Sequence, residues 1–546
     1  SSSVATRRVD QTVSGGSWVL LASDVQFAAG TDGYVELCNN IGSASRIVHA
    51  DAVKFVFKGG DATPPTVPGG LDAAAVSPTS IELTWDASLD DTGVAGYKII
   101  RNGTQIGTSP TNRFTDETGL LPNTVYSYRV SAYDAAGNDS GLCPAVWRAT
   151  LSVPPGPDTV TCTRAADAWH AASDFTFTAV GGFGAGRVSR YVWAWDTNPI
   201  HIWGSGDEDD WTGGDLKLTA PASGEYYLHL RGYNSEGVAS GAAHLGPYGY
   251  DPTPPAMLSV TADPYSTSIT SLNASWSAAD LESGIREYEY SVGTQPGEAD
   301  AKQWTTAGAA QSALITGVFL EDGETYYVNV RAVNGAGSVS GVLSSGGTTI
   351  AQAASSAGEA RGFPDGTLVA IEGQTVTAAF DGFFYIGDRS SGLRVVSGEA
   401  VTVNRSVTVI GTLALVNGCE RALELAHMVV GDDTDGVIAA SMVQRSLGGG
   451  AQNAYTPGVT GGAGVNNIGL LVRVAGRVTA LTEDGFYLED GSGLKDAPGN
   501  TGVRVWVGSG ALPEAGAFIQ VTGISSCRAS GSAVVPLVLA RSISIL

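Results

Sequence analysis

Acidic side chains gather at three turns of the sequence, where they could together bind a calcium ion. These turns hold Asp90-Asp91, the run from Asp207 to Asp210, and Asp432-Asp433 with Asp435. Calcium takes roughly six to eight oxygen ligands, usually from several carboxylates on one flexible loop. None of the turns matches a twelve-residue EF-hand loop, and an acidic turn facing solvent is the alternative at each. Asp207, Asp209 and Asp210 are the best metal-ligand candidates of the three sets.

Tryptophans cluster between residues 193 and 211, around the acidic run Asp207 to Asp210, and their rings could stack on sugar rings. Trp193 and Trp195 share one face of the segment YVWAW with Tyr191, because side chains alternate along a strand. We expect that face to belong to the core. Trp203 and Trp211 lie in segments with loop character and are therefore the candidate ligand-binding residues.

No catalytic motif accompanies these candidates. The six histidines are scattered over the chain, and His229, between Leu228 and Leu230, is expected to be a strand residue rather than a ligand or base. The sequence has no G-x-S-x-G, H-E-x-x-H or Walker motif, and no G-x-G-x-x-G after a strand. A catalytic carboxylate pair needs only proximity in the fold. No segment resembles a catalytic domain, however, so we expect the chain not to be an enzyme.

The net charge of the chain limits the kinds of partner that it can bind. The net charge of −24 argues against non-specific binding to nucleic acid or an anionic membrane, which needs a basic surface. No apolar run of about 18 residues is present, so we expect no membrane insertion. The chain begins SSSVATRRVD, without an initiator Met or an apolar signal region, and is expected to be a mature or excised part of a longer precursor.

The five cysteines show no metal-binding spacing. None forms a CxxC pair or has a histidine nearby at zinc-ligand spacing. With an odd number, at least one thiol stays free or pairs between chains. Cys143 and Cys162 flank a proline-rich linker and are the candidate disulfide.

β-Strands must position the candidate acidic residues and tryptophans. Segments such as IELTW, YSYRVSAY and YYVNVRAV alternate apolar and polar residues, which is typical of half-buried strands. Proline clusters near residues 64, 154 and 254 mark stiff linkers, and each interval suits one sandwich. Tyr126, Tyr226 and Tyr326 open equivalent strands 100 residues apart, which indicates internal duplication.

The first repeat, residues 64–151, resembles a fibronectin type III domain. Trp85 in IELTW, Tyr97 in GYKIIRNG and the segment LPNTVYSYRVSAYDAAGN carry the resemblance. It implies a corner in which the hydroxyl of Tyr126 ties a turn back to the backbone. Residues 253–350 are similar, with Trp276 and Trp304. Residues 152–252 lack the early tryptophan, and we expect an immunoglobulin-like sandwich there.

Both ends of the chain differ from the repeats. Residues 1–60 resemble the C-terminal half of a golvesin or xanthan-lyase C-terminal sandwich, through Asp10-Gln11, Trp18 and the run from Ala50 to Val53. Residues 351–435 and 436–546 resemble bacterial OB-folds, the second after a connector, with matching F-Y-I-x-D-like strands at Phe384-Tyr385 and Phe486-Tyr487. These aromatics could stack bases, but the surrounding segments are poor in basic residues, so we expect no nucleic-acid partner.

The predicted fold is therefore all-β, with tandem fibronectin type III or immunoglobulin-like sandwiches followed by two small OB-like barrels. The main hypothesis is a secreted, non-catalytic structural subunit of a bacterial filament or cell-surface assembly. Its copies would join head to tail by strand complementation of the incomplete first sandwich. The alternative is a polysaccharide-binding accessory region of a secreted carbohydrate-active enzyme. Apart from calcium at the acidic turns, we expect no cofactor.

Overall fold

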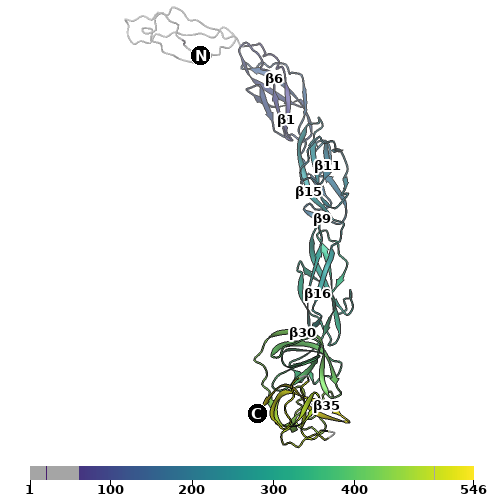
Figure 1. The fold of residues 1–546 in the computed structure, drawn as a ribbon. Coiled ribbons are helices and arrows are strands. Elements are labelled where there is room, and N and C mark those ends of the chain that lie inside the picture. Colours follow the sequence, from purple (N-terminus) through teal and green to yellow (C-terminus); the bar gives the residue numbers. More distant parts are fainter. Residues whose placement is uncertain (1–19, 21–60, 497–498, 509) are drawn as a thin grey trace, which may run out of the picture. The chain divides into compact units, whose positions relative to one another are not determined.

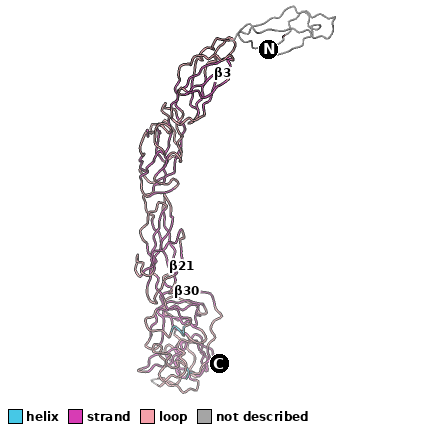
Figure 2. Tube along the Cα trace, turned by 180° about the vertical axis from the view of Figure 1, so that it is seen from behind, coloured by secondary structure: helices cyan, strands magenta, loops and turns pink. Residues whose placement is uncertain are grey.

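The computed structural model describes residues 20, 61–496, 499–508 and 510–546, and strands dominate this part of the chain (Figures 1 and 2). The helices among these residues are α1 (Ala357–Ala360) and a 3-10 turn, η1 (Gln444–Ser446). The predicted all-β class is confirmed. No helix of the described part is long and apolar enough to cross a bilayer. The golvesin-like sandwich and the strand exchange expected at residues 1–60 lie outside the described residues.

The fibronectin-like segment forms two sheets, in the orders β1-β2-β5 and β4-β3-β6-β7. Apolar residues of both sheets are buried, among them Leu83 and Trp85 near β2 and Ile99 on β3. The strands are β1 (Asp72–Ser77), β2 (Ser80–Thr84), β3 (Val94–Arg101), β4 (Thr104–Ser109), β5 (Arg113–Asp116), β6 (Val125–Asp134) and β7 (Val146–Ala149).

The middle domain has a three-stranded sheet, β13-β10-β8, and a five-stranded sheet, β12-β11-β14-β15-β9. An aromatic core holds Phe175, Phe177 and Tyr191, with Trp193 and Trp195 packed against it. The strands are β8 (Val160–Cys162), β9 (Ala168–His170), β10 (Asp174–Ala179), β11 (Arg190–Asp196), β12 (Asp209–Trp211), β13 (Leu216–Thr219), β14 (Gly224–Tyr233) and β15 (Ala239–Tyr250).

The third repeat also has two sheets. One has the order β16-β18-β21, and the other β17-β24-β22-β19-β20 with β23 beside β22. Its core includes Trp276, Tyr288 and Val328. The strands are β16 (Ala256–Ala262), β17 (Tyr265–Ser266), β18 (Ser271–Ala279), β19 (Ile285–Gly293), β20 (Lys302–Gly308), β21 (Ser312–Thr316), β22 (Thr325–Asn334), β23 (Leu343–Ser344) and β24 (Thr348–Ile350).

A tyrosine ties the same turn in all three repeats. The hydroxyl of Tyr126 accepts a hydrogen bond from the Leu121 N–H at 2.9 Å, and that of Tyr326 accepts one from the Glu321 N–H at 3.1 Å. Tyr226 bonds the backbone of Ala222 in the same way. The corner expected at Tyr126 is therefore confirmed, and the 100-residue repeat corresponds to a repeated contact.

Two closed barrels of matching topology follow. The first has the order β25-β26-β27-β28-β30-β29 and closes through β26–β29, and the second has the order β31-β32-β33-β34-β36-β35 and closes through β32–β35. The strands are β25 (Gln352–Ala354), β26 (Leu368–Phe380), β27 (Phe383–Gly387), β28 (Gly392–Val396), β29 (Arg405–Val416), β30 (Glu420–Asp433), β31 (Ala440–Ser441), β32 (Leu471–Thr482), β33 (Gly485–Glu489), β34 (Val503–Trp506), β35 (Phe518–Ser530) and β36 (Ala533–Ile545).

Gly411 and Gly523 occupy equivalent bulges in the two barrels. Each lies at a register shift between long antiparallel strands. A Cβ atom at Gly411 would collide with the Glu424 carbonyl oxygen, and one at Gly523 with the Leu539 carbonyl oxygen. Only glycine lets the neighbouring backbone approach this closely, which explains why both barrels have glycine at this position.

A buried polar network joins the barrels. Glu420, at the start of β30 in the first barrel, is 1% exposed. One carboxylate oxygen accepts from the Tyr385 hydroxyl at 2.8 Å, and the other from Arg394 Nη1 at 3.2 Å and from the Ser526 hydroxyl at 3.0 Å. Ser526 belongs to β35 of the second barrel. One carboxylate therefore satisfies buried donors from both barrels.

Candidate functional site

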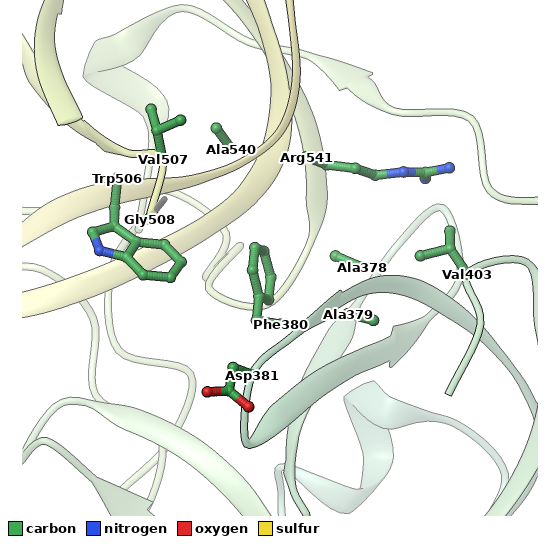
Figure 3. Close-up of a pocket in the computed structure, with 10 residues that line it drawn as sticks. All are labelled: Ala378, Ala379, Phe380, Asp381, Val403, Trp506, Val507, Gly508, Ala540 and Arg541. Atoms are coloured by element: carbon green, nitrogen blue, oxygen red, sulfur yellow. The ribbon is translucent and has the colours of Figure 1, made fainter. Parts of the chain in front are cut away.

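A groove between the two barrels is lined by half-buried aromatic and exposed charged side chains (Figure 3). Phe380 ends β26 and Asp381 begins the turn that follows, while Trp506 ends β34 and Arg541 projects from β36. The cavity has a volume of about 530 Å3. Strand ends of the two barrels therefore converge on this groove, although Phe380 and Trp506 are far apart in the sequence.

The aromatic rings of the groove form a continuous cluster. The rings of Phe380 and Phe383 stack with centroids 5.1 Å apart, and those of Phe380 and Trp506 are 5.8 Å apart at 60°. The Arg394 guanidinium lies 3.7 Å from the centroid of the Phe383 ring. Figure 3 shows the Phe380 ring at the centre of the groove with Trp506 to its left.

Two charged side chains, Asp381 and Arg541, also line the groove. Asp381 and Arg541 are exposed, and Arg541 Nη1 donates to the Thr377 carbonyl at 3.0 Å, which orients the guanidinium. Ring faces provide apolar contact area, while a carboxylate and a guanidinium provide hydrogen-bond acceptors and donors. This combination suits a flat, hydroxyl-rich ligand such as a sugar chain.

The aromatic pairs named from the sequence lie elsewhere. Phe384, Tyr385, Phe486 and Tyr487 are each at most 4% exposed. Phe384 and Phe486 belong to the cores of the two barrels, and Tyr385 belongs to the contact between the barrels. Phe384 and Tyr385 point to opposite faces of β27, and both faces are covered.

A second cluster gathers histidines on the outer face of the five-stranded sheet of the middle domain. Leu228 and Leu230 face the core, so His229 between them faces outward. The sheet register places His244 of β15 opposite His229, while Asp196 lies at the end of the adjacent β11. The loop after β11 brings His201 over this face, and His229 is 0% exposed beneath it.

The polar atoms of this cluster lie close together. His229 Nε2 is 3.3 Å from Asp196 Oδ1, and His201 Nδ1 is 3.4 Å from Asp196 Oδ2. The two imidazole rings stack with centroids 5.2 Å apart. His229 Nδ1 is 2.6 Å from His244 Nδ1. Burial lowers the pKa of His229 below its usual 6.5, although Asp196 acts in the opposite direction.

Glu208 contacts the other ring nitrogen of His201, Nε2. Its Oε1 lies 3.3 Å from His201 Nε2. The N–H of Gly204 holds the pKa of Glu208 at about 2, with help from those of Gly206 and Ser205. Glu208 is therefore an anion fixed by its own loop.

The predicted metal ligands Asp207 and Asp210 contact different side chains. Asp207 Oδ1 lies 3.9 Å from His201 Nε2, while Asp210 pairs with Arg190. No group of three ligand atoms within 4.8 Å of one another includes Asp209 or Asp210 among the described residues. The reason is that Asp209 and Asp210 are part of β12, where successive side chains point to opposite faces.

The two candidate tryptophans have different positions. Trp211 is 3% exposed, packs in the core of the middle domain and donates to the Gly214 carbonyl at 2.9 Å. It lies on β12 rather than in a loop, so its ring face is not open to a ligand. Trp203 is half-buried beside His201, with ring centroids 4.9 Å apart, and Arg231 lies 5.9 Å from its ring centroid.

The other acidic turns also have specific partners. Asp90 lies near Asp61 and Asp134, with one oxygen from each within 4.8 Å of the others. Asp433 pairs with Arg405 at 3.3 Å. An equivalent acidic group in the third repeat holds Asp251, Asp280 and Glu282.

Cys143 and Cys162 are both free thiols in the structure. Cys143 is 1% exposed and its sulfur accepts a hydrogen bond from the Val130 N–H at 3.1 Å. Cys162 is half-buried on β8 of the next domain, against the core of that domain. Each sulfur is thus accommodated within its own domain.

Comparisons with known proteins identify parts of this chain. Residues 1–57 match the Golvesin C-terminal domain, and residues 64–141 match the Fibronectin type III domain. Exoglucanase B of Cellulomonas fimi is 31% identical over 295 residues, which cover 51% of this chain and 25% of that protein. Alpha-amylase of Niallia circulans is 46% identical over 96 residues, covering 18% of this chain and 7% of that protein.

Chitinase Chi52 of Paenibacillus xylanexedens is 42% identical over 99 residues, covering 18% of this chain and 19% of that protein. The chain therefore spans a quarter or less of these curated relatives. The two resemblances inferred from the sequence are confirmed. Residues 1–57 are similar to the Golvesin C-terminal domain and residues 64–141 to the Fibronectin type III domain, and the described residues that follow form further all-β domains.

Proposed function

We propose that this chain is a non-catalytic accessory region of a secreted polysaccharide-degrading protein, and that the groove between the barrels binds a polysaccharide chain. The observation that carries the proposal is the groove itself, in which the rings of Phe380 and Trp506 lie beside the exposed Asp381 and Arg541. A sugar ring can stack on the aromatic faces while its hydroxyl groups bond the charged side chains.

The comparisons support this proposal over the structural-subunit hypothesis. The similar regions belong to proteins named as an exoglucanase, an alpha-amylase and a chitinase, and all three names are those of polysaccharide-degrading enzymes. The expected head-to-tail assembly stays a prediction, and light scattering of the purified chain over a range of concentrations tests it.

Binding to polysaccharide is measured with the full chain. Sedimentation with insoluble chitin, cellulose and starch identifies the polymer, and calorimetry with its soluble oligosaccharides gives the affinity. We expect Trp506→Ala to weaken binding at least tenfold. Asp381→Ala and Arg541→Ala change exposed side chains and are expected to weaken it without altering the fold.

Trp147→Ala is the matched control, since Trp147 is 63% exposed on β7, outside the groove. Equal retention of the wild type and all three groove variants on every polymer that binds would refute the groove as the site. Absence of binding to every polysaccharide would refute the accessory function.

A further inference from the structure

The histidine cluster of the middle domain is not used by the proposed polysaccharide groove. Three side chains converge there from separate segments: Asp196 ends β11, His229 lies within β14, and His201 comes from the loop between β11 and β12. Their nearest ligand atoms lie within 4.8 Å of one another. His229 and His201 are 0% and 8% exposed, so two imidazoles are withdrawn from solvent beside a carboxylate.

The distances in the cluster match the spacing of ligands around a shared ion. The two His–Asp196 contacts measure 3.3 and 3.4 Å. In a tetrahedral zinc site with bonds of about 2.0–2.1 Å, neighbouring ligand atoms are about 3.3 Å apart. One oxygen of Asp196 therefore lies at this spacing from His229, and the other oxygen lies at this spacing from His201.

Outer partners orient both rings. If Nε2 of His229 binds the ion, its Nδ1–H donates to His244 Nδ1, 2.6 Å away. If Nδ1 of His201 binds the ion, its Nε2–H donates to Glu208 Oε1, 3.3 Å away. Histidine ligands of metals usually donate their other N–H in this manner, which fixes the tautomer and the ring orientation.

We propose that Asp196, His201 and His229 form a binding site for zinc or a similar divalent transition metal. Two imidazole nitrogens and one carboxylate favour such an ion over calcium or magnesium, which prefer oxygen ligands alone. Three protein ligands leave a fourth position for water. The Asp196 side chain is 26% exposed and provides the route from solvent.

The bound ion would attach the loop after β11 to the sheet. That loop carries Ile200 and Ile202, which are 71% and 81% exposed, as well as Trp203. Because His201 lies on the loop while His229 lies on the sheet, an ion bound by both restrains the loop. Metal binding thus determines the position of an apolar surface segment.

The test uses the full chain after removal of metals by chelation. Equilibrium dialysis against zinc chloride, followed by elemental analysis, is expected to give one bound zinc that Asp196→Ala and His201→Ala each remove. Cobalt is expected to give the visible absorption bands of a tetrahedral site in the wild type only. Zinc is also expected to raise the midpoint of one thermal transition of the wild type and none of His201→Ala.

Two controls separate this site from others. Asp207→Ala removes a carboxylate that is 61% exposed and 3.9 Å from His201, and His427→Ala removes a histidine of the first barrel. Both are expected to keep the bound zinc. His201 lies on a loop, so circular dichroism should show the His201→Ala variant folded. No zinc bound to the wild type at 100-fold excess, or equal binding by folded His201→Ala, would overturn the proposal.

Discussion

Replacing Glu420 with alanine is expected to destabilise the barrel pair by about 3 kcal/mol. The carboxylate is 1% exposed and accepts hydrogen bonds from Tyr385, Arg394 and Ser526. Its removal leaves a guanidinium and two buried hydroxyls without their acceptor. Burial raises the pKa of Glu420, so the site disfavours the negative charge. Uncharged glutamine is therefore expected to cost only about 1–2 kcal/mol.

The magnitude follows from the environment of each donor. Breaking a buried ion pair by removing one partner costs about 3–5 kcal/mol. The Arg394 side chain is 16% exposed and lies over the Phe383 ring, so water and the ring replace part of the lost interaction. The expected loss of stability therefore lies at the lower end of this range, at about 3 kcal/mol. For a barrel pair of about 200 residues, 3 kcal/mol corresponds to a decrease in Tm of about 6–12 °C.

Differential scanning calorimetry of the full chain measures the effect. Glu424→Ala is the matched control, because Glu424 is exposed on the same strand, and its midpoint is expected to stay within about 2 °C of the wild type. A double-mutant cycle between Glu420 and Ser526 isolates the contact between barrels, expected at about 1 kcal/mol. A decrease below 2 °C for Glu420→Ala would refute the assignment of this network as a stabilising contact.

Three further predictions concern the sandwich domains. Tyr326→Phe removes the hydroxyl that accepts from a turn N–H at 3.1 Å and is expected to lower the free energy of unfolding by about 1 kcal/mol in urea denaturation; an unchanged midpoint would contradict the role of the corner. Asn334→Ala removes a 0% exposed amide that donates to Asp251 and Asp280, at an expected cost of about 2–3 kcal/mol; a loss below 0.5 kcal/mol would show that water replaces the amide. Burial raises the pKa of Tyr248 from 10 to about 12, so the folded state keeps a proton that the unfolded state loses between these values. Stability is therefore expected to be intact below pH 10 and to fall by up to about 3 kcal/mol towards pH 12. Tyr248→Phe should reduce this pH dependence of the free energy of unfolding, measured by urea titration. An identical pH dependence in both proteins would contradict the assignment.

Local sequence patterns predicted the all-β class and several of its strands. Alternation of apolar and polar residues identified strands, because a residue on a half-buried sheet faces either the core or solvent. The spacing of Tyr126, Tyr226 and Tyr326 predicted repeated corners, and all three hydroxyls bond the backbone of the preceding turn. Gly411 and Gly523 are equivalent positions, because the same close backbone approach recurs in both barrels.

The sites depended on contacts that local patterns do not encode. The sequence alone predicted a satisfied strand position for His229, and the outward direction follows from its neighbours Leu228 and Leu230. Its meeting with His201 and Asp196 required the loop to fold back over the sheet. A histidine that interrupts the outer face of an alternating strand, opposite a second histidine on the next strand, is the signal that could have found it.

The sequence by itself determined the all-β class, the repeats and the strand faces, since these depend on periodicity between near neighbours. The tertiary structure decided which faces and loops meet. Trp211 became a core residue because β12 pairs with β11, and Phe380 came beside Trp506 because two barrels pack together. Such contacts depend on sheet register and on packing between distant segments, whose free energy is a sum over many residues rather than a property of any short motif.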